Sequence, residues 1–92
     1  MQQKKYPYDH PWRQQASNIK YIAGWEGGAA YAAEKDGAYL LIIDEGTMAD
    51  FLFDDDQDLL DSLVTVLTFD SLDERHNYIK SRFSAKMLIL RE

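Results

Sequence analysis

The clearest structural signal in the chain lies in residues 29–44, which read AAYAAEKDGAYLLIID. Asp36 and Gly37 separate two apolar segments, and an Asp-Gly pair suits the positive φ angles of a two-residue hairpin turn. Residues 29–35 and 38–44 are therefore expected to form a β-hairpin. Its second strand is apolar on both faces, which is typical of a strand that is covered on each side. We expect this strand in the middle of the sheet.

The sequence before the hairpin leaves one alternative open. Residues 1–10 hold Tyr6-Pro7 and end at His10, which precedes Pro11, so we expect them to form a flexible, irregular arm. Residues 11–25 fit either an amphipathic helix or a short strand over residues 19–25, and the pattern slightly favours a helix that runs into a strand. Gly27 and Gly28 predict a turn, because two glycines disfavour both regular elements.

The sequence after the hairpin predicts strands and one well-marked helix. Residues 47–53 are expected to return as a strand, and residues 54–61 as an acidic loop with a short helical turn that directs Leu59 and Leu60 inward. Residues 63–69 are β-branched and aromatic, which favours another strand. Ser71 and Glu74 have the spacing of a capping box and predict a helix that starts there. Residues 86–90, KMLIL, predict a closing strand.

These elements predict an α+β fold, with a mainly antiparallel β-sheet of four to five strands and one or two α-helices. We expect a flexible arm over residues 1–10 and a single domain over residues 11–92. A length of 92 residues allows one hydrophobic core and is too short for two. Because so small a core leaves little margin of stability, a homodimer that buries more apolar surface stays an alternative.

The composition excludes several classes of protein. The chain has no cysteine, which rules out disulfides, thiolate nucleophiles and sulfur-ligated metal centres. Its longest strongly apolar run, residues 38–43, is far shorter than a membrane-spanning helix. The N-terminal residues lack the apolar core of a secretion signal. We therefore expect a cytoplasmic protein that does not contact a membrane.

Charge is distributed unevenly along the chain. The net charge is −6, yet residues 36–74 hold twelve acidic residues and neither Lys nor Arg. Residues 1–35 and 75–92 each carry a small excess of positive charge. Like charges repel within a screening length of about 8–10 Å. The acidic block is therefore suited to meet a cationic partner, whose encounter its field would accelerate.

The acidic block does not match a known metal-binding loop. Asp54, Asp56 and Asp58 alternate as at the start of an EF-hand loop, which binds calcium through converging carboxylates. However, Leu59 stands where that loop needs Gly, and Thr65 stands where it needs Glu. We expect a solvated acidic segment and no bound metal or other cofactor.

The sequence also lacks a catalytic motif, so we do not expect an enzyme. The two histidines, His10 and His76, lie in no ligand-spaced or nucleophile-activating pattern. One further hypothesis is a small hydrolase, in which His76 would act together with carboxylates and a divalent ion. It ranks third, after the two hypotheses that follow. Direct binding of nucleic acid is not expected, because most of the surface has the same sign of charge as phosphate.

The leading hypothesis is a non-enzymatic binding protein that occludes a basic surface of a partner, in particular of a nucleic-acid-binding enzyme or complex. Phe51, Leu52 and Phe53 would add apolar contacts if exposed, although burial in the core is the expectation for each. The expected partner-binding residues are Asp44, Glu45, Asp50, Asp54, Asp55, Asp56, Asp58 and Asp61.

The chain combines small size, a clustered negative charge and the lack of cysteine. In these features it resembles phage-encoded inhibitors that mimic nucleic acids, such as anti-restriction and anti-CRISPR proteins, and also acidic immunity proteins and antitoxins. The resemblance implies inhibition by occlusion. An alternative from another class is a structural or regulatory homo-oligomer, in which Tyr39, Leu41 and Ile43 form an apolar sheet face that pairs with a second copy.

Overall fold

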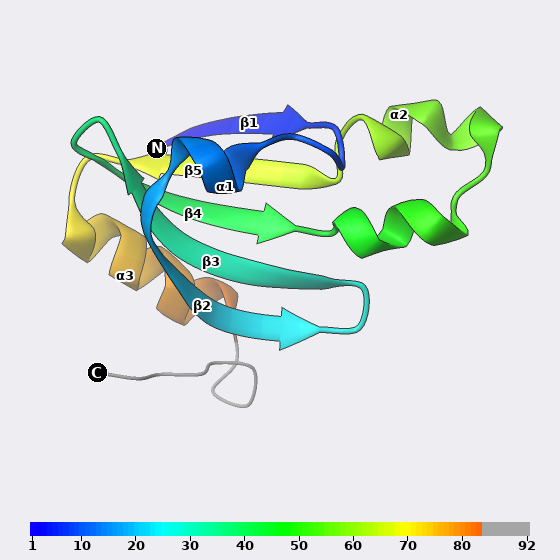
Figure 1. The fold of residues 1–92 in the computed structure, drawn as a ribbon. Helices are drawn as coiled ribbons and strands as arrows, with labels where there is room; N and C mark the ends of the chain where they lie inside the picture. Colours follow the sequence, from blue (N-terminus) through cyan, green and yellow to red (C-terminus); the bar gives the residue numbers. More distant parts are fainter. Residues whose placement is uncertain (84–92) are drawn as a thin grey trace.

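Five strands form one sheet in the order β1-β5-β4-β3-β2, and each neighbouring pair is antiparallel (Figure 1). The computed structural model describes residues 1–83. The strands are β1 (Gln2–Tyr6), β2 (Ser17–Trp25), β3 (Gly28–Lys35), β4 (Ala38–Asp44) and β5 (Val64–Phe69). The helices are α1 (Trp12–Gln15), α2 (Gln57–Leu60), α3 (Leu72–Arg82) and the 3-10 helices η1 (Gly46–Phe51) and η2 (Asp54–Asp56). The predicted α+β fold is confirmed.

The hairpin predicted from residues 29–44 is present and places β4 at the centre of the sheet. Asp36 and Gly37 have φ angles of 51° and 81°, as a two-residue turn with left-handed residues requires. β4 pairs with β3 on one side and with β5 on the other. Leu41 and Ile42 are both fully buried. Because successive side chains of a strand point to opposite faces, the sheet is covered on both sides of β4.

Different helices cover the two faces of the sheet. On one face, Ile79 and Phe83 from the end of α3 pack in a cluster with Leu41. On the other face, Trp12 of α1 packs in a cluster with Ile42. The face considered above for self-pairing, which includes Leu41, is therefore the face that α3 covers within the same chain. This surface is therefore not available for the contact between copies that the homo-oligomer alternative requires.

α3 begins where the sequence predicts it. The backbone N–H of Glu74 donates to Ser71 Oγ over 3.1 Å, so that the hydroxyl caps the first turn. Asp73 and Glu74 lie in the first turn, and Lys80 and Arg82 lie in the last, which suits the direction of the helix dipole. The strand predicted over residues 63–69 is also confirmed, as β5. The predicted strand over residues 86–90 lies outside the described residues.

The expectation of an irregular arm at the N-terminus is wrong for residues 2–6. They form β1, which pairs with β5 from Gln2 opposite Thr68 to Tyr6 opposite Val64. Proline restricts the residue before it to extended conformations, and such a conformation also suits the last residue of a strand. For residues 11–25, the helix that runs into a strand is confirmed. This helix has only one turn, because Ala16 at its end is already extended.

The strand expected over residues 47–53 is also wrong. Residues 46–51 form η1, which starts when the Gly46 N–H donates to Asp44 Oδ1 over 2.9 Å and the Met48 N–H donates to the Glu45 carbonyl over 3.0 Å. These local hydrogen bonds turn the chain directly after β4, before it can pair again with the sheet. No helix within residues 1–83 is long and apolar enough to cross a membrane.

Candidate functional site

Between β4 and β5 the chain leaves the sheet as a projecting segment, residues 46–62, which we call the acidic lobe. In Figure 1 it extends to the right beyond the strand ends and contains η1, η2 and α2. Asp44 and Val64 lie opposite each other in the sheet, yet nineteen residues separate them along the chain. Antiparallel neighbours need a turn of only about two residues, as between β3 and β4. The sheet therefore does not require the length of the lobe.

The base of the lobe is held firmly by Asp44. Its Oδ2 accepts a hydrogen bond from Trp12 Nε1 over 3.0 Å, and its Oδ1 accepts one from the Gly46 N–H over 2.9 Å. The Glu45 N–H donates to the Leu63 carbonyl over 2.9 Å, which closes the two ends of the lobe against each other. These bonds fix the direction in which the lobe leaves the sheet.

Two further bonds tie the lobe to neighbouring turns. The Tyr8 N–H donates to the Leu60 carbonyl over 3.1 Å, and Thr47 Oγ1 donates to the Gly27 carbonyl over 2.8 Å. The lobe is thus attached along both of its chain segments, η1 through the β2–β3 turn and α2 through the segment after β1. These contacts fix the orientation of the acidic lobe. The lobe contributes nothing to the buried cores, since no residue of η1, η2 or α2 is buried.

Hydrogen bonds within the lobe shape its tip. The Phe53 N–H donates to Asp56 Oδ2 over 3.0 Å, while the Asp56 N–H donates to the Phe53 carbonyl over 2.9 Å. In α2, Gln57 Nε2 donates to Asp61 Oδ1 over 2.9 Å, one turn further on. The donors in these bonds are a backbone N–H and an amide, so neither carboxylate bonds to a cation there.

Large apolar side chains stand beside these carboxylates and face solvent. Phe51 and Phe53 are each 76% exposed, and Leu59 is 53% exposed. The expectations that both phenylalanines are buried and that Leu59 points inward are wrong, and Leu52 is only half-buried. The error at the two phenylalanines follows from the strand expected over residues 47–53, which would have directed alternate side chains into the core. The structure replaces it with a 3-10 helix that stands off the sheet.

The structure places the eight predicted partner-binding residues in one region but in different environments. Asp44 and Glu45 are half-buried at the base, and the oxygens of Asp44 bond within the chain. Asp56 is half-buried and bonds to the backbone of Phe53. The exposed members are Asp50, Asp54, Asp55, Asp58 and Asp61. The sequence analysis did not predict that Phe51, Phe53 and Leu59 lie on the surface. The Asp residues that interrupt this apolar run were the signal that could have indicated their exposure.

Two basic side chains of the described residues are engaged with groups outside the lobe. The Arg13 guanidinium lies over the rings of Trp12 and Tyr31, at 4.3 and 4.6 Å from their centroids. Arg75 Nη1 donates to the carbonyls of Ala33 and Leu40, over 2.8 and 3.3 Å. Arg13 is thus held by aromatic rings of α1 and β3, and Arg75 is held by carbonyls of the sheet.

Partial burial lowers the pKa of the Arg75 guanidinium, while the nearby Glu34 and Tyr39 raise it. A guanidinium titrates far above neutral pH and stays charged. This cation therefore remains a fixed positive charge beneath α3.

The third hypothesis, a metal-assisted hydrolase, gains no support from the geometry. His10 stacks on Tyr6 with ring centroids 4.0 Å apart, whereas His76 is exposed on α3. Within residues 1–83, no three side chains of the types His, Asp and Glu gather in a group that could hold a metal ion.

Comparisons with known proteins add no relative. No protein-family model, no curated protein and no solved structure matches this chain.

Proposed function

We propose that this chain is a non-enzymatic binding protein, and that its acidic lobe docks on a basic surface of a partner protein and occludes it. The observation that carries the proposal is the exposure of Phe51 and Phe53 next to the exposed carboxylates of Asp50, Asp54 and Asp55. Leaving a large apolar side chain in water forgoes about 1.5–3 kcal/mol of stabilisation. A small domain that displays several of them together on one projecting segment has the surface of a binding site.

The lobe combines the two kinds of residue that protein interfaces use. Aromatic side chains supply most of the binding free energy where a partner buries them, and a surrounding polar rim excludes water. Here Phe51 and Phe53 would be the buried anchors, and Asp50, Asp54 and Asp58 would form the charged rim. The rim sets the sign of the partner, because carboxylates gain from contact with Lys and Arg and raise the rate of encounter.

A surface that binds nucleic acid is the kind of basic surface that this rim fits best. Asp54 lies in η2, Asp58 lies in α2, and Asp61 directly follows α2. Carboxylates so close in the chain give the lobe a dense negative charge, which is also the property of a nucleic-acid strand that basic proteins bind. The lobe would then hold the partner by competing with phosphate for its Lys and Arg side chains.

The test is affinity capture with the full chain and two variants of equal net charge. The lobe variant carries Asp54→Asn, Asp55→Asn and Asp58→Asn. The control variant carries Asp36→Asn, Asp70→Asn and Glu74→Gln, which are exposed acids outside the lobe. Both variants have three fewer negative charges than the parent chain. We expect the control to retain the captured basic protein and the lobe variant to lose most of it, as quantified by mass spectrometry.

A second measurement tests the class of partner. Duplex DNA or RNA added to the purified complex should displace the chain from the partner if the two compete for one surface. Equal capture by the lobe variant and the control would contradict the proposal. A complex that nucleic acid leaves unchanged would contradict its nucleic-acid-binding part alone.

A further inference from the structure

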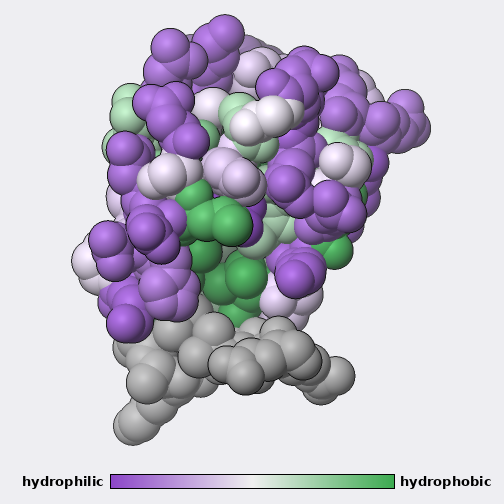
Figure 2. Space-filling model, turned by 90° about the vertical axis from the view of Figure 1, so that its left-hand side faces the viewer, coloured by the Kyte–Doolittle hydropathy of each residue, from purple (hydrophilic) through white to green (hydrophobic). Residues whose placement is uncertain are grey.

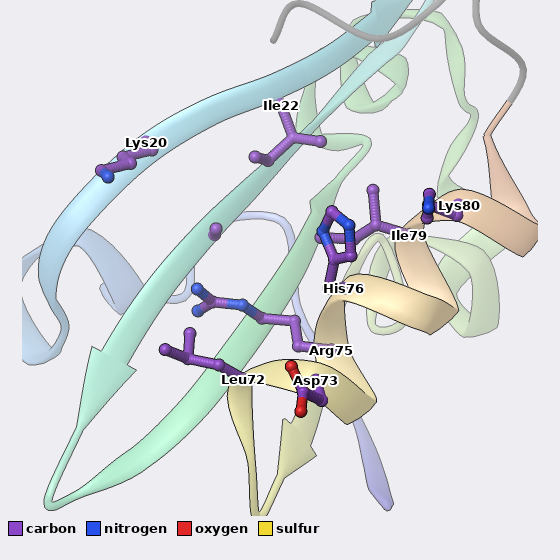
Figure 3. Close-up of a pocket in the computed structure, with 9 residues that line it drawn as sticks. Lys20, Ile22, Leu72, Asp73, Arg75, His76, Ile79 and Lys80 are labelled. Atoms are coloured by element: carbon purple, nitrogen blue, oxygen red, sulfur yellow. The ribbon is translucent and has the colours of Figure 1, made fainter. Parts of the chain in front are cut away.

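A groove separates α3 from β2, the outermost strand of the described sheet (Figure 3). It has a volume of about 360 Å³. Ile22, Ala32 and Ile79 line its apolar part, while Lys20 on β2 and Arg75 and Lys80 on α3 surround it with positive charge. A second hollow, of about 490 Å³, shares Lys20, Ala32 and Arg75 and continues the groove along β2.

The sequence of the sheet explains why this groove exists. β3 presents alanines where β4 presents leucine and isoleucine, and a methyl group is too short to fill the space beneath a helix. α3 packs closely on the sheet near its end, at Ile79 and Phe83, whereas Leu72 at its start remains 53% exposed. The first turns of α3 therefore leave a gap above the alanines. Ala32 and Ile79 are themselves buried, so the apolar surface that a side chain from outside would meet is mainly that of Ile22 and Leu72.

The charge around the groove is opposite to that of the acidic lobe. The groove and the adjoining hollow carry Lys20, Arg75 and Lys80 against two carboxylates, Asp73 and Glu34. Arg75 is held in place by its bonds to two sheet carbonyls, so its charge is fixed there. The lobe, in contrast, holds six Asp residues and no basic residue within residues 46–62.

The lobe and the groove occupy different ends of the molecule. In Figure 1 the lobe projects to the right, whereas α3 begins at the left and runs beneath the sheet. Figure 2 views the molecule from that left-hand side and shows apolar residues in the centre of a largely hydrophilic surface. A single chain therefore cannot place its own lobe in its own groove, but a second copy can reach it.

We propose that the groove between α3 and β2 binds the acidic lobe of a second copy of this chain. Phe53 or Phe51 of one copy enters the apolar part of the groove, and the neighbouring carboxylates meet Lys20 and Lys80. Because the two surfaces differ, the contact is heterologous and assembles chains head to tail. The inference rests on the proposed role of the lobe as a docking element, and it makes self-association a competitor of the partner.

The negative net charge of the whole chain does not prevent this contact. At physiological ionic strength charges act over about 8 Å, so the groups at the contact dominate over distant carboxylates. The contact involves one projecting lobe and a short groove, which is typical of weak, reversible association. Self-association would therefore hide the lobe at high concentration and release it on dilution.

Sedimentation velocity on the full chain tests the proposal, with two charge-reversed variants. The groove variant carries Lys20→Glu and Lys80→Glu, and the lobe variant carries Asp54→Lys and Asp55→Lys. All four residues are exposed, and both variants should keep the circular dichroism spectrum of the parent. The parent should associate as its concentration rises from about 10 μM to about 1 mM, a range that covers weak contacts. Each variant alone should remain largely monomeric. In the groove variant the acidic lobe meets two new negative charges, and in the lobe variant two positive charges replace carboxylates of the lobe that would meet Lys20 and Lys80.

The decisive sample is the equimolar mixture of the two variants. The unchanged lobe of the groove variant then finds the unchanged groove of the lobe variant, so association should return, and no loss of folding could produce that rescue. A parent chain that stays monomeric throughout would overturn the proposal, as would association that neither reversal weakens. The groove variant keeps an intact acidic lobe. Its continued capture of a basic partner would separate the failure of this inference from failure of the proposed function.

Discussion

The β3–β4 hairpin and the acidic lobe are neighbours in the chain, and both contain many large apolar residues, yet their side chains have opposite fates. In β4, Leu41 and Ile42 are fully buried. In the lobe, Phe51 and Phe53 are largely exposed. The difference comes from what lies over each segment: α3 and Trp12 cover β4 from two sides, whereas the lobe projects past the strand ends. Hydrophobicity stabilises the fold only where another element is positioned to cover it.

The largest effect that this contrast predicts is on the hairpin. Leu41→Ala should lower the free energy of unfolding by about 2–5 kcal/mol, because it removes buried methyl groups and leaves a cavity beneath α3. Leu59→Ala, which deletes the same atoms from the lobe, should change it by less than about 0.5 kcal/mol. Urea denaturation of both variants measures the difference. Similar losses of stability would show that the lobe belongs to the core.

A smaller effect is expected where the two regions meet. Asp44→Ala removes the acceptor for the buried Trp12 indole and for the Gly46 N–H, and should cost about 1–3 kcal/mol of stability. Asp58→Ala, at an exposed carboxylate of the lobe, should cost less than about 0.5 kcal/mol. Thermal unfolding followed by circular dichroism compares them. Equal midpoints would mean that Asp44 does not hold the base of the lobe.

The turn of the hairpin should respond to a change of backbone preference alone. A Cβ at Gly37 would meet no atom within 4 Å, but φ is +81° there. Gly37→Ala should therefore cost about 1–2 kcal/mol, through the left-handed conformation and without a steric clash. Asp36→Asn should be nearly neutral, because Asn accepts a positive φ. Urea denaturation reports both values, and an unaffected Gly37→Ala variant would contradict the strained turn.

The smallest effect on stability is expected for the exposed aromatics. The double variant Phe51→Ser and Phe53→Ser should unfold within about 0.5 kcal/mol of the parent, while its affinity for a captured partner should fall by about 2 kcal/mol or more. Stability and binding are thus predicted to separate in the lobe. A marked loss of stability with unchanged binding would contradict the assignment of Phe51 and Phe53 to the binding surface.

The sequence predicted the parts of the fold that depend on local chemistry. Asp36-Gly37 located the hairpin, the two apolar faces of β4 located the centre of the sheet, and Ser71 located the start of α3. It failed for β1, because pairing with β5 is a long-range choice that leaves no local periodicity in residues 2–6. It also failed at Phe51 and Phe53, where alternation suggested a strand although the bond from Gly46 to Asp44 begins a 3-10 helix.

For the candidate site, the block of carboxylates was visible in the sequence, but its surroundings were not. The sequence could not reveal that Asp44 holds the base of the lobe, because Trp12, its partner, lies 32 residues away. The cationic groove was also hidden, since Lys20 and Lys80 come together only when α3 packs near β2. Pairings between distant segments therefore determine which of the charged residues are available to a partner.

The most direct test of the lobe as a binding surface is the association rate constant with the captured partner, measured against ionic strength by stopped-flow. For the parent chain, the rate should fall at least about tenfold as salt rises to physiological strength and beyond, because opposite charges steer the encounter. The Asp54, Asp55 and Asp58 neutralised variant should show a much flatter dependence, while the variant neutralised at Asp36, Asp70 and Glu74 should follow the parent. Parallel curves for all three proteins would contradict the lobe as the docking site.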